Sequence, residues 1–66
     1  MELMVNGAGR TLPEGTTVAE AVAATTSQDR GLAVAVNGEV VPRADWSATL
    51  LRGGDRVEVL SAAQGG

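Results

Sequence analysis

The sequence predicts a small α+β domain, in which a mixed five-stranded sheet carries one helix packed on one face. Three observations support this fold class. The chain has 66 residues, enough for a single domain with a thin core. Several short runs alternate between apolar and other residues as strands do, and one run has helical spacing. One helix cannot cover both faces of a sheet, so it has to lie on one of them.

The first unit is predicted to be a β-hairpin. Residues 2–6 alternate in a strand-like way and place Leu3 and Val5 on one face. Residues 6–9, Asn-Gly-Ala-Gly, are typical of a turn, because Asn and Gly adopt positive φ at little cost. Residues 10–12 then form a short returning strand.

A capping box predicts where the helix begins. The Thr17 hydroxyl can accept a hydrogen bond from an N–H of the first turn, while the Glu20 side chain reaches back to the Thr17 amide. Apolar residues follow at helical spacing: Val18, Ala21 and Val22. The helix is expected to run for roughly ten residues and to be terminated by residues 29–31, Asp-Arg-Gly.

Three further strands complete the predicted sheet. Residues 32–36 alternate large and small apolar side chains, and the large ones are expected to face the helix. The Asn-Gly pair at 37–38 is a second tight turn, which leads into a short strand over residues 39–41. The Gly-Gly-Asp turn at 53–55 precedes the last strand, residues 56–60.

Residues 43–52 show no clean period and are expected to be irregular. Trp46 and either Leu50 or Leu51 are expected to pack at the edge of the core. Trp46 is the only aromatic residue of the chain, so a packing role is favoured over a ligand platform.

This order of elements is satisfied in few residues by the β-grasp (ubiquitin-like) fold. The helix joins the first hairpin to the third strand, which suits a right-handed crossover. The β-grasp domain is expected to span residues 1–61. Residues 62–66 have no apolar periodicity and are expected to form a flexible C-terminal tail that ends in Gly-Gly.

The composition leaves little for independent catalysis. The chain has no Cys and no His, and all five of its basic residues are Arg. The usual nucleophiles, the near-neutral proton shuttle and the commonest zinc ligands are therefore missing. No metal site, no bound cofactor and no enzymatic activity are predicted, and the absence of Cys indicates a cytoplasmic protein.

Charge and hydropathy narrow the range of partners. The net charge is −3, and the arginines are scattered along the sequence, so no cationic surface for nucleic acid is expected. No apolar stretch reaches membrane length. A mildly acidic surface is compatible with a basic protein partner or with solubility alone. We expect the free protein to be a monomer.

Several motifs resemble those of the ThiS family, the sulfur carrier proteins of thiamine biosynthesis. They are the run Val36-Asn37-Gly38-Glu39-Val40-Val41-Pro42-Arg43, Trp46, the run Gly54-Asp55-Arg56-Val57-Glu58-Val59, and the ending Gln64-Gly65-Gly66. The resemblance extends over essentially the whole chain. The Gly-Asp pair and the Gly-Gly ending are shared with all β-grasp sulfur carriers, whereas the Asn-Gly-Glu-Val-Val-Pro-Arg run points to the thiamine branch.

The resemblance implies that other enzymes act on this chain. A ubiquitin-activating-like adenylyltransferase would use ATP and Mg²⁺ to adenylate the carboxylate of Gly66. A sulfur donor linked to a cysteine desulfurase would convert the adenylate to a thiocarboxylate, from which a thiazole synthase would take the sulfur. The residues before it, Ala62, Ala63, Gln64 and Gly65, would enter the partners' active sites, and a glycine backbone suits a narrow channel because it lacks Cβ atoms.

The partners also have to recognise the folded body. We hypothesise that they dock on the sheet face away from the helix, which is expected to carry Met4, Ala33, Ala35, Glu58 and Leu60.

Other interpretations remain open at this stage. A terminal Gly-Gly is often only a disordered chain end. The same residues are also compatible with a carrier for molybdopterin or cysteine synthesis, or with a non-covalent ubiquitin-like interaction module. Glu39 and Arg43 are equally well explained as recognition residues and as solvated turn residues.

Overall fold

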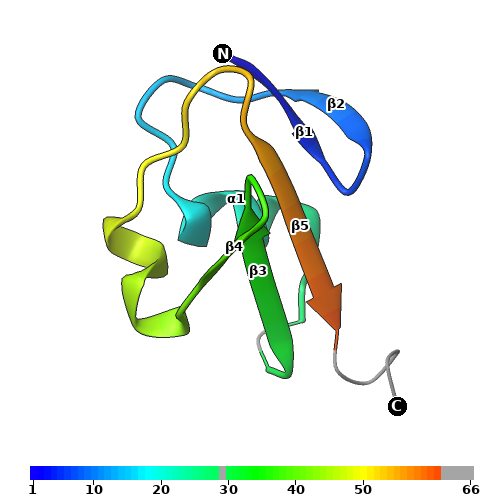
Figure 1. Ribbon diagram of the computed structural model, residues 1–66, viewed down its shortest axis with the longest axis vertical. Coiled ribbons are helices and arrows are strands. Elements are labelled where there is room, and N and C mark those ends of the chain that lie inside the picture. Colours follow the sequence, from blue (N-terminus) through cyan, green and yellow to red (C-terminus); the bar gives the residue numbers. More distant parts are fainter. Residues whose placement is uncertain (29, 62–66) are drawn as a thin grey trace.

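The computed structural model describes residues 1–28 and 30–61, and the predicted α+β, β-grasp architecture is confirmed (Figure 1). The elements in chain order are β1 (Glu2–Val5), β2 (Ala8–Thr11), α1 (Val18–Thr25), β3 (Leu32–Val36), β4 (Glu39–Val41), the 3₁₀ helix η1 (Arg43–Ala48) and β5 (Arg56–Ser61).

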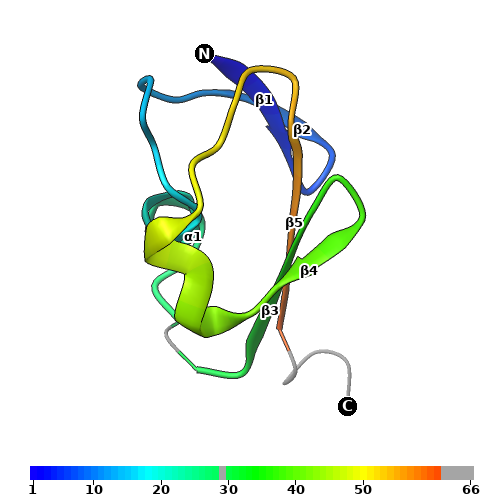
Figure 2. The same ribbon diagram turned by 60° about the vertical axis from the view of Figure 1, so that its left-hand side comes forward.

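The five strands form one mixed sheet in the order β2-β1-β5-β3-β4. The last strand, β5, therefore lies in the middle, parallel to β1 and antiparallel to β3. Figure 2 shows the sheet nearly edge-on, with α1 and η1 on the same side of it. The opposite face is not covered by any element in the described part of the chain.

Two-residue turns close both hairpins. Asn6 and Gly7 have φ of 51° and 81°, and Asn37 and Gly38 have φ of 53° and 84°. Positive φ at both positions is the signature of the type I′ turn, whose twist matches that of the flanking strands. The predicted turn at 6–9 was too long, because β2 begins immediately after Gly7, two residues earlier than the sequence indicated.

The predicted capping box is present at the start of α1. The Glu20 backbone N–H donates to the Thr17 hydroxyl at 3.2 Å, and the Thr17 N–H donates to the Glu20 carboxylate at 2.9 Å. These two bonds satisfy backbone donors that the first turn of a helix leaves unpaired.

The helix has eight residues and ends at Thr25, before residues 29–31, where the sequence predicts its end. Threonine hydroxyls account for the early end. The Thr25 hydroxyl donates to the Ala21 carbonyl, and Thr26 is extended, with a hydroxyl that accepts from the Gln28 N–H at 3.1 Å. Side-chain bonds of this kind compete with the helical hydrogen-bond ladder.

The core lies between the sheet and the layer of α1 and η1. Its buried members are Leu3, Val5, Val18, Ala21, Val22, Val34, Trp46, Leu51, Val57 and Val59. Leu51 is buried and Leu50 is 62% exposed, so Leu51 is the one of the two leucines that packs in the core. The segment expected to be irregular contains η1, in which the Trp46 indole N–H donates to the Val41 carbonyl at 2.8 Å.

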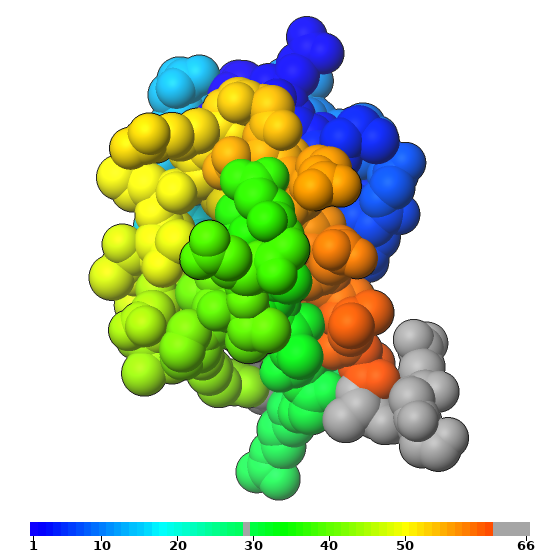
Figure 3. Space-filling view, in the orientation of Figure 1, coloured from blue at the N-terminus to red at the C-terminus, as the bar shows by residue number. Residues whose placement is uncertain are grey.

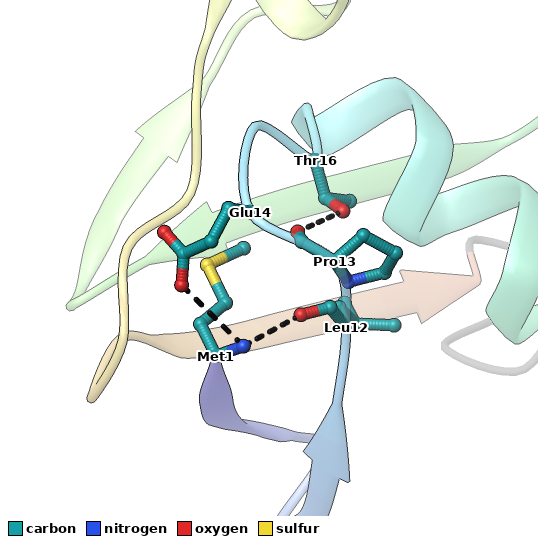
Figure 4. Close-up of polar contacts among 5 residues, drawn as sticks. All are labelled: Met1, Leu12, Pro13, Glu14 and Thr16. Atoms are coloured by element: carbon teal, nitrogen blue, oxygen red, sulfur yellow. Dashed lines mark hydrogen bonds and ion pairs between the residues drawn. The ribbon is translucent and has the colours of Figure 1, made fainter.

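Short polar contacts fix the loop between β2 and α1 (Figure 4). The Met1 ammonium group donates to the Leu12 carbonyl at 2.8 Å and lies 3.5 Å from the Glu14 carboxylate. The Glu14 side chain is 85% exposed, so this ion pair adds little stability. The Thr16 hydroxyl donates to the Pro13 carbonyl at 2.6 Å, and this contact orients the approach to the helix.

Candidate functional site

Strand β5 carries the chain to the segment that the sequence analysis singled out. Ser61 is the last residue of β5, and the predicted modified residue, Gly66, lies outside the described residues. The same is true of the predicted inserted tail: Ala62, Ala63, Gln64 and Gly65. The described structure defines the folded side of the candidate site, which is the central strand and the sheet face around it.

Side-chain alternation along β5 separates two faces. Val57 and Val59 are buried against the helix layer, whereas Arg56, Glu58 and Leu60 point to the uncovered face. Figure 3 shows β5, in orange, accessible along its length between β1 in blue and the β3–β4 hairpin in green.

The sheet register brings the five predicted docking residues onto this uncovered face. In the β3–β5 pairing, Ala33 lies opposite Leu60 and Ala35 opposite Glu58. Met4 lies opposite Arg56 in the β1–β5 pairing. Met4 is 40% exposed and Leu60 is 63% exposed. Side chains opposite each other on neighbouring strands share a face, so these residues form one continuous surface.

One member of this surface, Val40, is not predicted by the sequence pattern. It lies opposite Ala35 in the β3–β4 pairing and is 75% exposed. Its neighbour Val41 lies opposite Val34 and packs against the core. The alternation within β4 was the available signal, but a strand of three residues with two adjacent valines does not show which of them points outward.

We name the apolar part of this face the sheet patch, and its residues are Met4, Ala33, Ala35, Val40 and Leu60. In the described part of the chain, three of the four exposed large apolar side chains belong to the sheet patch, and the fourth is Leu50. Arg56 and Glu58 supply one charge of each sign on the same face. Exposed apolar side chains gathered on one face make this face a candidate interaction surface.

Hydrogen bonds from the second Asn-Gly turn fix the start of β5. The Asn37 side-chain amide donates to the Asp55 carboxylate at 3.0 Å, and its carbonyl accepts from the Arg56 N–H at 2.9 Å. The other carboxylate oxygen of Asp55 accepts from the Arg52 N–H at 2.8 Å. Two of the motifs noted in the sequence, Asn-Gly and Gly-Asp, are therefore joined in space and have a structural role.

Trp46 is a core residue. It is 7% exposed, and the Arg43 guanidinium lies over its ring, 5.2 Å from the centroid. An arginine at this distance is attracted by the face of the ring and shields it from water.

Between residues 1 and 28 and between 30 and 61, no three His, Cys, Asp or Glu side chains are grouped so that they could hold a metal ion. Across the same residues, no helix is long and apolar enough to cross a membrane.

Comparisons with known proteins find relatives that agree with the β-grasp fold described above. The model of the ThiS family matches residues 3–66, which include the C-terminal Gly-Gly. The chain is similar to the sulfur carrier protein ThiS of Escherichia coli strain K12, with 27% identity over 66 residues and full coverage of both proteins. It is also similar to the crystal structure of thiamine biosynthesis protein ThiS from Geobacter metallireducens. That comparison gives a TM-score of 0.82 and 38% identity, and covers 92% of this chain and 93% of the other.

Proposed function

Since the chain belongs to the ThiS family of sulfur carrier proteins of thiamine biosynthesis, we propose that it carries sulfur as a thiocarboxylate on Gly66. The observation that carries this proposal is the family match through the Gly-Gly ending, together with a central strand that leads to this ending beside an exposed apolar face.

The terminal carboxylate needs activation before it can accept sulfur. An α-carboxyl group is an anion at neutral pH and a poor electrophile. Attack of a carboxylate oxygen of Gly66 on the α-phosphate of ATP would release pyrophosphate and form an acyl adenylate. A persulfide on a donor linked to a cysteine desulfurase would then displace AMP and form an acyl disulfide. A second thiol would attack the donor's sulfur, so that the S–S bond breaks, the donor becomes part of a new disulfide and the thiocarboxylate is released. The activating enzyme would supply Mg²⁺ and positive charge for the phosphate transfer.

The folded domain would serve recognition in this cycle. Holding the tail in one conformation in a partner's active site costs conformational entropy, and contacts made by the folded body have to offset this cost. We propose that the sheet patch makes these contacts, first with the adenylyltransferase and then with a thiazole synthase. It lies on both sides of the central strand that leads to the tail, so binding there would guide residues 62–66 towards the partner.

Intact mass spectrometry tests the proposal. The protein is incubated with ATP, Mg²⁺, a ubiquitin-activating-like adenylyltransferase and a sulfur source, and the ThiS protein of Escherichia coli is treated in parallel as the positive control. The expected product has one oxygen replaced by sulfur at Gly66, and a variant that lacks Gly66 is expected to stay unmodified. An unchanged mass, under conditions that modify the control, would count against the proposal.

A further inference from the structure

Side chains from outside the sheet hold the end of β5. The parallel pairing with β1 stops where Val5 lies opposite Val57. Beyond this point the Asn6 side-chain carbonyl accepts from the Val59 N–H at 2.8 Å, so a side chain takes the place of the next backbone acceptor. At the last residue of β5 the contact is made by Gln28, which belongs to the loop after α1.

Gln28 and Ser61 form a reciprocal pair. The Gln28 Nε2 group donates to Ser61 Oγ at 3.1 Å, and Ser61 Oγ lies 3.3 Å from Gln28 Oε1, to which it can donate. The second Nε2 hydrogen goes to the Arg30 carbonyl at 2.8 Å. These contacts fix the orientation of the amide, because a flipped amide would place Oε1 against the Arg30 carbonyl. The Gln28 backbone is held as well, by its bond to the Thr26 hydroxyl.

Ser61 is therefore held on two sides. It lies opposite Leu32 in the β3–β5 pairing, and it continues the alternation of Val57 and Val59, which directs its hydroxyl towards the helix layer and Gln28. An apolar residue would continue the core pattern here. A hydroxyl group instead makes a specific contact with a residue 33 positions away in the sequence.

We propose that Gln28 is a positioning residue for the C-terminal segment. Together with Ser61 it holds the last residue of β5 in the sheet, so that no residue of β5 is released when Gly66 reaches a partner's active site. Each further residue released from β5 would add about 3.3–3.6 Å of reach and backbone entropy that docking must remove. The inference rests on the proposed function, because it concerns delivery of Gly66.

The first test measures the anchor without any partner. Ser61→Val and Ser61→Thr have the same β-branched shape, and only threonine keeps the hydroxyl. Amide hydrogen exchange at Leu60 is expected to be roughly 2- to 10-fold faster in Ser61→Val and in Gln28→Ala than in Ser61→Thr, while exchange at Val34 stays unchanged. The double variant Gln28→Ala/Ser61→Val is expected to add nothing further, because either single change already breaks the pair.

The second test measures delivery. The adenylation of each variant by a ubiquitin-activating-like adenylyltransferase is followed with ATP and radiolabelled pyrophosphate. The KM for the carrier is expected to rise roughly 2- to 10-fold in Ser61→Val and Gln28→Ala, with kcat within about twofold, while Ser61→Thr stays close to the unaltered protein. Ser47→Ala, which removes an exposed hydroxyl on η1, is the control for a general effect of losing a serine.

Equal Leu60 exchange, or equal KM, in Ser61→Val and Ser61→Thr would overturn the inference. Faster exchange without a change in KM would also overturn it, because the pair would then be a structural contact only. If the unaltered protein is not adenylated at all, the proposed function itself fails. The exchange experiment needs no partner, so it still tests the contact between Gln28 and Ser61 in that case.

Discussion

The side-chain carbonyl of Asn6 accepts a 2.8 Å hydrogen bond from the backbone N–H of Val59, 53 residues later in the chain. The Asn6 backbone N–H also donates to the Val57 carbonyl at 2.9 Å. Asn6 makes both contacts while it holds the positive φ that the first turn requires. One residue therefore closes the first hairpin and extends the pairing of the central strand.

Two substitutions at Asn6 separate these roles. Asn6→Gly keeps the freedom to adopt positive φ but loses the bond to Val59, which is expected to lower the free energy of unfolding by about 1 kcal/mol. Asn6→Ala loses the bond and also strains the turn, for a total of about 2–3 kcal/mol. Urea denaturation of both variants measures the difference. Equal losses would show that the left-handed conformation contributes nothing measurable.

A second prediction concerns the indole N–H of Trp46. Trp46→Phe keeps an apolar ring but leaves the Val41 carbonyl without its donor, and is expected to destabilise the domain by about 1–3 kcal/mol. Trp46→Ala is the comparison for loss of the whole ring, with an expected cost of about 3–5 kcal/mol. Unfolding has to be followed by circular dichroism, since no other aromatic residue is present. Full stability in Trp46→Phe would mean that the hydrogen bond is energetically neutral.

Local chemistry explains which parts of the fold could be predicted. The Asn-Gly turns and the Thr17–Glu20 capping box act over at most four residues, so adjacent residue types are enough to locate them. The helix η1 was not predicted, because it has no period of its own. It is stabilised where Trp46 packs into the core and bonds to Val41, and these contacts depend on the rest of the fold.

The same reasoning applies to the candidate site. The alternation of residue types placed Met4 and Leu60 on the uncovered face, because these residues belong to strands that could be identified from the sequence. Val40 was missed, since only its pairing with Ala35 shows that it points outward. The contact between Gln28 and Ser61 joins residues 33 positions apart, and no local pattern signals such a contact.

The capping box gives a third prediction. Thr17→Ala removes the oxygen that accepts from the Glu20 N–H and is expected to lower stability by about 1 kcal/mol. Thr17→Ser keeps that oxygen and is the matched control, with an expected change within about 0.5 kcal/mol. Urea denaturation followed by helical circular dichroism compares the two variants. An equal loss in both would assign the effect to the threonine methyl group, because both variants lack it.

The fourth prediction tests the sheet patch with two leucines of nearly equal exposure. Leu60 is 63% exposed within the patch, and Leu50, at 62%, lies in the segment that contacts the start of α1. Leu60→Glu is expected to raise the KM of a ubiquitin-activating-like adenylyltransferase for the carrier about tenfold or more. The reason is that docking would bury an unpaired carboxylate. Leu50→Glu is expected to leave the KM within about twofold, because a charge at this position stays in water.

The free energy of unfolding of both glutamate variants should lie within about 0.5 kcal/mol of that of the unaltered protein, since each substitution replaces a mostly exposed side chain. Urea denaturation verifies this before the kinetics are compared. A third variant, Val40→Glu, then asks whether the patch extends to β4, and it should resemble Leu60→Glu if the partner covers the whole face. The same KM for Leu60→Glu and Leu50→Glu would show that the partner binds elsewhere. Exposed apolar area would then be a poor guide to the docking surface of this carrier.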